Sequence, residues 1–481
     1  MTGNRGNDKM IVKKLNQVHS IHFTGIKGVG MTALACCAQD LGIKISGSDI
    51  DEVFVTDATL KKRKIKWLTG FRPKNIDHPD LLIATGAHGG LTNPEVTEAK
   101  KKKIPVMTHG EALGLFMKNK IGISVCGVGG KTTTAAILAT IVHYNKVPFS
   151  YAVGVGEIFP LGAPGHCDKK GNLFIAEADE YANSVGVDNR PRFFWQNPKF
   201  IICTNIEHDH PDIYKDINAT QKVFLEFFQK IPKDGYLIIN GDNSHNLEVL
   251  KSFSGPYYTY GIGEKNDWKV KNIKKEKEKN TFSVYFKNKR IGDFKINVPG
   301  QFNILNATAT IILSQILKIP IYKIKKGLEQ FKGTKRRFEF IGEKNQIKVY
   351  DDYAHHPMEI KNTLRSARHW FGKNSRIIVI FQSHTYSRTK KLLPQFAQSF
   401  SDANKVIITK IYASSREKKD LKISGQILAN AIKKYHQRVN FVHNPYMVPK
   451  LIKKIIQKKD IIITMGAGDI WKIDKKIIEI L

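Results

Sequence analysis

The stretch of residues 121–136, IGISVCGVGGKTTTAA, decides how this chain folds. A short apolar run leads into a glycine-rich turn, and the residues that follow favour a helix. Gly127 and Gly130 let backbone N–H groups face an anion at the positive end of that helix. Lys131 can reach the outer phosphates of a nucleotide, and the hydroxyl of Thr132 can hold Mg²⁺. The stretch therefore predicts a phosphate-binding loop between a strand and a helix.

The spacing of this loop leaves a second interpretation open. The pattern Gly127-x-x-Gly130-Lys131-Thr132 is shorter than G-x-x-x-x-G-K-[ST], because Val125 stands where that pattern has its first glycine. An ordinary strand–turn–helix, with glycines used only for close packing, fits the same six residues. Other parts of the chain must decide between the two.

Two acidic clusters downstream favour the phosphate-binding interpretation. Each follows an apolar run that predicts a strand, LFIAEADE in one case and FIICTN in the other. Carboxylates and an imidazole at strand ends supply the ligands that Mg²⁺-nucleotide chemistry needs. These residues are Glu177, Asp179 and Glu180 in the first cluster, and Asn205, Glu207, Asp209, His210 and Asp212 in the second, TNIEHDHPDIY.

The composition indicates a globular, cytoplasmic protein. Its 481 residues are too many for one core and suggest about three domains. No apolar run of about 18 residues occurs, and the residues MTGNRGNDKMIVKK lack the apolar centre of a signal peptide, so we expect no membrane insertion. The five cysteines show no C-x-x-C spacing, which predicts buried, reduced thiols, with neither disulfides nor a cysteine metal site.

The net charge is +34, from 77 lysines and arginines against 43 acidic residues. The lysines are spread over the whole chain without interleaved aromatic residues, so we expect a solvated surface and no nucleic-acid binding. A positive field would favour polyanionic small substrates.

A βαβ unit precedes the phosphate-binding loop. VHSIHFTGI predicts a strand, residues 31–41 a helix, and IKISGSD a strand that ends at Asp49. Gly25, Gly28 and Gly30 would bring the backbone close to a diphosphate, and Asp49 could bind a ribose hydroxyl. Because the glycines do not form G-x-G-x-x-G, a nicotinamide dehydrogenase is one possibility and another nucleotide diphosphate fits as well.

Further along, residues 257–298 alternate apolar and polar residues between charged turns, which predicts antiparallel strands beside the α/β core. Asn303 and Asn306 lie at the head of an apolar helix, where they could cap it or bond a base.

A last doubly wound sheet is expected from Phe331 onward, with polar residues gathered at its strand ends. His355 and His356 could form a zinc pair. Adjacent side chains on a strand diverge and no third ligand is nearby, so metal binding is the lesser interpretation.

Eight motifs, in order over nearly the whole chain, resemble those of the Mur ligase family. They are GVGGKTTT, EADEY, TNIEHDHPDIY, FNILNATA, GTKRRFE, DDYAHHP, FQSHTYSRT and GAGDI. Three strings, FTGIKGVGMTALA, FQSHTYSRT and IYASSRE, resemble members that join L-alanine to UDP-N-acetylmuramate. The resemblance implies that ATP phosphorylates the carboxylate and that the amine then attacks the acyl phosphate. ATP and Mg²⁺ are the implied cofactors, and we expect a monomer or homodimer.

Residues 1–18 are polar and basic, which predicts a flexible extension. The resemblance also implies three α/β domains after it. A Rossmann-like domain at 19–118 would bind the uridine nucleotide, and a P-loop ATPase-like domain at 119–330 would bind ATP. A second Rossmann-like domain at 331–481 would bind the amino acid.

Individual roles follow from the same resemblance. The implied catalytic residues are Lys131, His210 and Arg337, and the implied metal ligands are Thr132, Glu177 and His210. The implied ATP site comprises Gly127, Val128, Gly129, Gly130, Lys131, Thr132, Thr133, Asn303, Asn306, Arg337 and Asp352. The uridine nucleotide would meet Gly25, Gly28, Gly30, Ser48, Asp49 and His88, and the amino acid would meet His356, His384 and Arg388. Gly129 and Phe302 stand where the family usually has histidine.

Other functions stay open at this point. A related amide ligase, such as one that recycles muramyl tripeptide or a folylpolyglutamate-type enzyme, is the nearest alternative. FQSHTYSRT disfavours the first and the early glycine loop disfavours the second. A P-loop ATPase that acts with nucleic acid would bind DNA in a strongly salt-dependent way. A dehydrogenase would bind a dinucleotide and ignore ATP.

Overall fold

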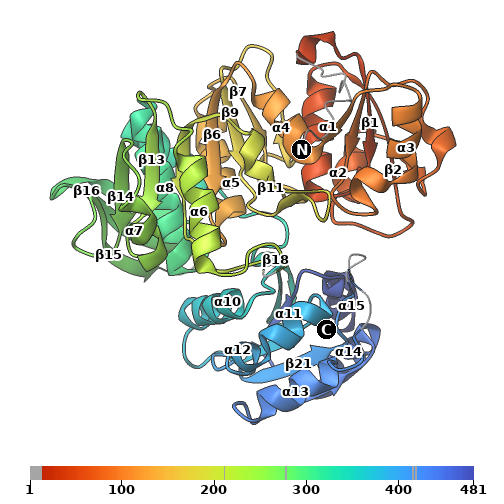
Figure 1. The fold of residues 1–481 in the computed structure, drawn as a ribbon. Helices are drawn as coiled ribbons and strands as arrows, with labels where there is room; N and C mark the ends of the chain where they lie inside the picture. The colour runs from red at the N-terminus through yellow and green to blue at the C-terminus, as the bar shows by residue number, and fades with distance from the viewer. Residues whose placement is uncertain (1–13, 211, 277–278, 414–416, 418–419) are drawn as a thin grey trace. The chain divides into compact units, whose positions relative to one another are not determined.

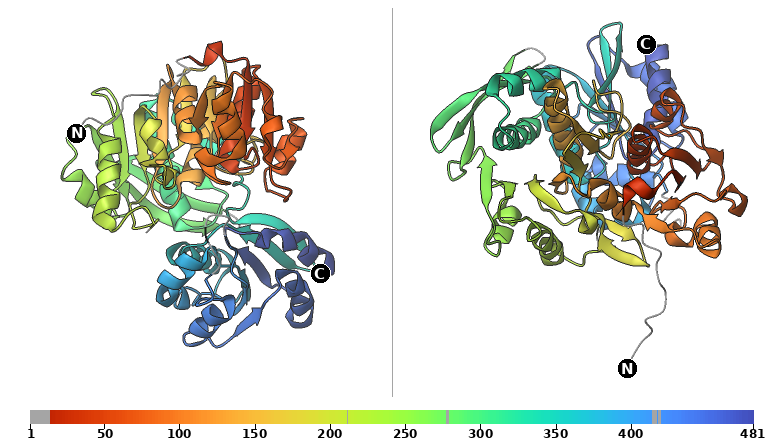
Figure 2. Two further views of the ribbon diagram at one scale, coloured as in Figure 1. Left: turned by 45° about the vertical axis from the view of Figure 1, so that its right-hand side comes forward. Right: turned by 90° about the horizontal axis from the view of Figure 1, so that it is seen from above.

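The computed structural model describes residues 14–210, 212–276, 279–413, 417 and 420–481. Within these residues the chain forms α/β sheets of five, ten and six strands, together with a separate strand pair (Figures 1 and 2). It divides into two compact units, of which the first holds the five-stranded sheet and most of the ten-stranded sheet. The predicted fold class is confirmed. The domain limits at residues 118 and 330 remain predictions, and residues 1–13 of the predicted extension lie outside the described part.

The first sheet has the strand order β3-β2-β1-β4-β5, and every neighbouring pair is parallel. All five strands therefore end at one edge, where ligands of such sheets bind. Its strands are β1 (Ser20–Thr24), β2 (Lys44–Asp49), β3 (Leu68–Thr69), β4 (Leu81–Ala84) and β5 (Val106–Thr108), and its helices are α1 (Val29–Asp40), α2 (Asp57–Lys62), α3 (Pro94–Lys101) and α4 (His109–Met117). Ahead of them, Leu15–Gln17 form a short 3-10 turn.

The central sheet has the order β17-β16-β15-β14-β13-β12-β6-β9-β7-β8. Strand β6, which leads into the glycine-rich turn, lies between β9 and β12 and is parallel to both. The elements are β6 (Ile121–Cys126), α5 (Lys131–Tyr144), β7 (Phe149–Ala152), β8 (Gly165–His166), β9 (Leu173–Glu177), β12 (Pro198–Cys203), α6 (Ile217–Phe228), β13 (Tyr236–Asn240), α7 (Ser244–Leu250), β14 (Tyr257–Gly261), β15 (Trp268–Glu276), β16 (Lys279–Phe286), β17 (Lys289–Ile296), α8 (Gln301–Ile316) and α9 (Ile321–Gln330). The separate pair is β10 (Ala182–Ser184) and β11 (Asp188–Pro191).

The prediction of antiparallel strands over residues 257–298 is wrong in part. Strand β14 pairs in parallel with β13, and β15 pairs in parallel with β14, so both extend the central sheet. Alternation of apolar and polar residues reports which face of a strand is buried, but it does not report the direction of the neighbouring strand.

The six-stranded sheet of the second unit has the order β18-β19-β23-β20-β21-β22, with an antiparallel pair at the β18 edge and parallel pairs elsewhere. Almost every residue of its central strands is buried, as both faces carry helices. Its elements are β18 (Glu339–Lys344), β19 (Ile347–Asp352), α10 (Pro357–Phe371), β20 (Ile377–Phe381), α11 (Tyr386–Lys391), α12 (Leu393–Ala397), β21 (Lys405–Thr409), α13 (Gly425–Lys433), β22 (Val439–Val442), α14 (Val448–Ile455), β23 (Ile461–Met465) and α15 (Asp474–Ile480).

All five cysteines are buried, in agreement with their apolar sequence contexts. Among the described residues, no helix is long and apolar enough to cross a membrane.

The first and central sheets share one apolar core, because residues of α1 cluster with Ala152, Phe174 and Ala176 of the central sheet. Gly165 of β8 lies where the backbone of α1 comes close to the central sheet. A Cβ atom there would lie 2.1 Å from the carbonyl oxygen of Ala33 in α1.

We expect Gly165→Ala to lower the free energy of unfolding by about 1–3 kcal/mol, because the methyl group must push α1 away from β8. Gly292→Ala is the matched control, since its Cβ would lie 3.4 Å from the flexible Lys325 side chain and 3.6 Å from Phe294 Cε2, both ordinary contact distances. Urea unfolding of both variants measures the difference. Equal midpoints would contradict the packing described here.

Candidate functional site

The glycine-rich turn is braced by the end of the neighbouring strand β12. Gly127 has a φ of +122°, and a Cβ on it would lie 2.2 Å from Thr204 Oγ1, so no larger residue fits. Thr204 donates its hydroxyl to the carbonyl of Gly129 at 2.5 Å, and the Gly129 N–H donates to Asn205 Oδ1 at 2.8 Å. The close approach explains the glycine requirement, and it fixes the turn at the start of α5.

Lys131 is the central charge of this turn. Its Nζ donates to the carbonyl of Gly127 at 2.6 Å and to Glu180 Oε2 at 2.9 Å. Burial would lower the pKa of Lys131, but the neighbouring carboxylates, Glu180 foremost, hold that pKa well above its ordinary value. Burial raises the pKa of Glu180 even though Lys131 opposes the shift. The side chain of Lys131 is 12% exposed and that of Glu180 is 2% exposed.

Thr132 is oriented by the end of strand β9. Its hydroxyl donates to Glu177 Oε1 at 3.0 Å, and Glu177 Oε2 accepts from the Gly154 N–H at 2.9 Å. The parallel pairing of β6 with β9 thus brings two of the three predicted metal ligands into contact.

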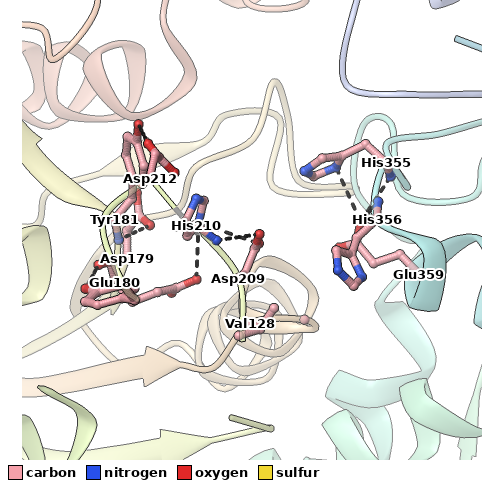
Figure 3. A network of polar contacts seen from close by, with 12 residues as sticks. Val128, Asp179, Glu180, Tyr181, Asp209, His210, Asp212, His355, His356 and Glu359 are labelled. Carbon is pink, nitrogen blue, oxygen red and sulfur yellow. Dashed lines mark hydrogen bonds and ion pairs between the residues drawn. The ribbon is translucent and has the colours of Figure 1, made fainter. Parts of the chain in front are cut away.

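His210 comes from the loop after β12 and has a φ of +57°. Its Nε2 lies 3.7 Å from Glu180 Oε1 and 3.6 Å from Asp209 Oδ2, and its ring lies 4.5 Å from that of Tyr181 (Figure 3). Glu180 therefore stands between Lys131 and His210. The sequence predicts Glu180 only as a member of an acidic cluster suited to Mg²⁺, and not as the partner of Lys131.

Among the described residues, no group of three or more histidine, cysteine, aspartate and glutamate side chains is arranged to hold a metal. A Mg²⁺ ion commonly keeps several waters and binds one or two carboxylates together with substrate phosphates, so it does not need such a group.

On α8, Asn306 lies against the turn, since a Cβ on Gly130 would be 2.8 Å from Asn306 Oδ1. Asn303 donates its amide to the Pro299 carbonyl at 2.7 Å. Asn306 is therefore placed close to the phosphate-binding turn, and the predicted adenine contacts of both residues remain predictions.

At the edge of the first sheet, Gly25 has a φ of +67° and Gly28 caps α1. Asp49 is 1% exposed and accepts the N–H groups of Lys27 and Ile50, each at 2.8 Å. Burial raises the pKa of Asp49. This carboxylate fixes the shape of the glycine loop, and its predicted contact with the nucleotide remains a prediction.

Ser48 and His88 differ in their surroundings. Ser48 donates to the buried Glu95 Oε2 at 2.5 Å, and Asn75 donates to the other oxygen of Glu95 at 2.6 Å. His88 is half-buried. Its Nε2 lies 4.0 Å from Asp49 Oδ1, and its ring centroid lies 5.2 Å from that of Phe71. The role of Glu95 in holding Ser48 and Asn75 could not be predicted from the sequence. A glutamate in the first turn of a helix is common because it interacts favourably with the helix dipole.

In the second unit, Asp352 ends β19 and is 6% exposed. Its oxygens accept the N–H of Phe338 at 2.8 Å and the N–H of Ala354 at 2.9 Å. Arg337 extends over the Tyr353 ring, 5.0 Å from its centroid. The preceding Arg336 is buried and donates a hydrogen bond from Nε to Asp351 Oδ2. This contact could not be predicted, because the sequence Arg336-Arg337 gives no sign of which arginine points inward.

Histidines follow at the same sheet edge. His356 caps α10 through its side chain, and Glu359 accepts the N–H groups of His355 and His356 at 3.1 and 3.2 Å (Figure 3). The ring of His384 stacks on that of Tyr412 with 5.7 Å between centroids, and its centroid lies 6.1 Å from that of His355. His384, which follows β20, thus lies beside His355, which follows β19.

Arg388 lies in α11, two residues after its start, and its side chain is half-buried. The carboxylate of Glu417 accepts the Ser387 N–H at 3.2 Å at that start. Residues 414–416 of the motif IYASSRE lie outside the described residues.

Family models match three successive parts of the chain. The Mur ligase family catalytic domain matches residues 20–121, the Mur ligase middle domain residues 125–314, and the Mur ligase glutamate ligase domain residues 336–468. The chain belongs to the Mur ligase family.

Its relatives include UDP-N-acetylmuramate–L-alanine ligases. That of Acetivibrio thermocellus is 39% identical, over 95% of this chain and 95% of the relative. That of Desulfitobacterium hafniense is 36% identical, over 95% of this chain and 99% of the relative. The crystal structure of the UDP-N-acetylmuramate–alanine ligase of Thermotoga maritima matches with a TM-score of 0.79 and 26% identity, covering 96% and 98% of the two chains.

The buried Asp352 predicts a pH dependence of stability. Burial raises its pKa from 3.8 to about 6, although Arg337 opposes the shift. The folded state therefore binds a proton that the unfolded state releases between pH 4 and 6, so stability falls as pH rises through this window, by about 3 kcal/mol in total.

We expect Asp352→Asn to remove this slope, whatever its effect on stability at one pH. Urea midpoints of wild type and variant at several pH values from 4 to 7 measure the slope. The same slope in both proteins would show that Asp352 is not its source.

Proposed function

We propose that this chain uses ATP to join L-alanine to the carboxylate of UDP-N-acetylmuramate, an early step in making peptidoglycan precursors. The observation that carries the proposal is the parallel pairing of β6 with β9 and β12, which gathers Lys131, Glu177 and His210 at one sheet edge. The names of the full-length relatives support the choice of substrates.

The residues present fit the phosphates of ATP. Gly127 and Gly130 have positive φ angles and no room for a side chain, so the turn presents its backbone to the ligand. Lys131 supplies the cation for the transferring phosphoryl group, and Glu180 keeps it charged until the nucleotide arrives.

The residues also fit Mg²⁺, which Thr132, Glu177 and His210 would hold. A bound Mg²⁺ would supply positive charge that lets the γ-phosphate and the substrate carboxylate approach each other. The chain's own part is to hold Glu177 at the end of β9, Thr132 after the turn that follows β6, and His210 in the loop after β12.

In the reaction, a carboxylate oxygen of the sugar nucleotide bonds to the γ-phosphorus and ADP leaves. The alanine nitrogen then attacks the carbonyl carbon, the C–O bond to phosphate breaks, and the amine loses a proton. Lys131 and Arg337 stabilise the charge of the transferring phosphoryl group. Asn303, Asn306 and Asp352 bind the rest of ATP, and His356, His384 and Arg388 bind the amino acid.

The experiment that tests this function incubates the pure protein with UDP-N-acetylmuramate, ATP, Mg²⁺ and a panel of L-alanine, glycine, L-serine and an alanyl tripeptide. Mass spectrometry of the uridine nucleotide identifies what was joined. We expect the L-alanine adduct to form fastest. Preferential ligation of the tripeptide would replace the proposal with a recycling ligase, and no adduct would refute it.

We expect Lys131→Met to reduce ligation at least about 1000-fold, because the cation that faces the transferring phosphoryl group is lost. The matched control is Lys222→Met, on the exposed side of α6, which should keep wild-type turnover. Coupled assays of ADP release, with far-UV circular dichroism to check folding, measure both. Turnover within tenfold of wild type in Lys131→Met would refute the role of this lysine.

We expect Arg388→Lys to raise the KM for L-alanine about 10- to 100-fold, while the KM values for ATP and UDP-N-acetylmuramate change little. A guanidinium can meet a carboxylate with two parallel hydrogen bonds, and an ammonium cannot reproduce this geometry. Arg365→Lys, at an exposed position of α10, is the control. If both variants show wild-type alanine dependence, the amino acid binds elsewhere.

A further inference from the structure

Arg192 lies between the two loops that the proposed function requires one substrate to span. The uridine diphosphate belongs at the glycine loop after β1, and the reacting carboxylate belongs beside Lys131 after β6. Both loops lie in the first compact unit. The sugar must then lie across the residues between these two sheet edges, and none of those residues has a role so far.

The guanidinium of Arg192 is held at one end by the central sheet. Its Nη1 donates to Asp179 Oδ2 at 2.7 Å, two residues beyond the end of β9. Its backbone N–H donates to the Tyr181 carbonyl at 3.0 Å, and the guanidinium lies 5.7 Å from the Tyr181 ring centroid. The side chain of Arg192 is 21% exposed, so a ligand can reach it.

The other end of the guanidinium faces the first sheet. A Cβ on Gly86, just after β4, would lie 3.1 Å from Arg192 Nη2 and 3.2 Å from the Asn183 carbonyl oxygen. In the part of the chain that the structure describes, the bond to Asp179 is the one side-chain hydrogen bond of Arg192. A guanidinium carries five N–H groups, so donors remain for a ligand.

His109 continues this polar surface to the glycine loop. A capping box of Thr108 and Glu111 fixes it as the first residue of α4, and a Cβ on Gly30 would lie 2.7 Å from His109 Nε2. Burial and then Arg192 lower the pKa of His109 to about 4, so its ring is neutral. Its buried Nδ1 has no hydrogen-bond partner among the described residues.

We propose that Arg192, held by Asp179, binds the sugar of the nucleotide substrate between the two loops. Because Asp179 already balances its charge, its remaining N–H groups suit neutral oxygen acceptors, such as sugar hydroxyls and the carbonyl of an N-acetyl group, better than a phosphate. The inference rests on the proposed function and adds a specificity-determining residue to it.

Calorimetric titration separates the sugar from the rest of the nucleotide. Wild-type protein is titrated with UDP and with UDP-N-acetylmuramate. The Kd for UDP divided by the Kd for UDP-N-acetylmuramate measures the affinity that the sugar adds. We expect Arg192→Gln to reduce this ratio at least about tenfold, roughly the equivalent of one hydrogen bond to a charged group, while the Kd for UDP stays within twofold. Gly86→Ala, which crowds Nη2, should show the same change to a smaller extent.

Arg190→Gln is the matched control. Arg190 lies two residues away, pairs with Asp188 at 2.8 Å, is 49% exposed, and lies 4.6 Å from the Trp195 ring. It should leave both dissociation constants unchanged. KM values provide a second readout, since Arg192→Gln should raise the KM for UDP-N-acetylmuramate and leave the KM for ATP unchanged.

Three outcomes would overturn the inference. A lower melting temperature with unchanged affinities would make the Arg192–Asp179 pair purely structural. Equal losses of affinity for UDP and UDP-N-acetylmuramate would place Arg192 at the diphosphate. Equal wild-type affinities for the two ligands would leave the sugar without a site. These binding results are independent of turnover, so absent ligation by the wild type refutes the proposed function separately.

Discussion

The ion pair between Lys131 and Glu180 is the interaction on which the central site depends. A buried ammonium is costly unless it is paired, and here one carboxylate and the Gly127 carbonyl compensate it. The pair exists only because β9 and β6 are parallel neighbours, which places the end of one strand beside the turn after the other. The topology of the sheet therefore sets the chemistry of the turn.

The same arrangement concentrates acidic residues where a highly charged substrate must bind. Burial opposes ionisation of Asp179, but Arg192, Lys131 and His210 hold its pKa well below the usual range. Each carboxylate thus has its own cation, Glu180 with Lys131 and Asp179 with Arg192. In our account Lys131 binds the phosphoryl group and Arg192 binds the sugar. The loop after β9, which carries Asp179 and Glu180, therefore orients the groups that bind both parts of the substrates.

Much of the fold was predictable from the sequence, because strand ends are marked by apolar runs that stop at glycine or at clustered polar residues. The phosphate-binding turn, the acidic strand ends and the α/β class follow from such local signals. The direction of β14 did not, because it depends on which strand lies next to it. Side-chain partners were also beyond reach: sequence order could not show that Ser48 donates to Glu95 or that Asp352 accepts two backbone N–H groups.

The central claim is that the chain activates a carboxylate by transferring a phosphoryl group to it. Ligation with UDP-N-acetylmuramate labelled with ¹⁸O in its carboxylate tests this most directly, by mass analysis of the inorganic phosphate released. If the carboxylate oxygen attacks phosphorus and later leaves with phosphate, each phosphate formed with product carries one ¹⁸O atom. Phosphate without ¹⁸O, formed together with the amide product, would contradict the account.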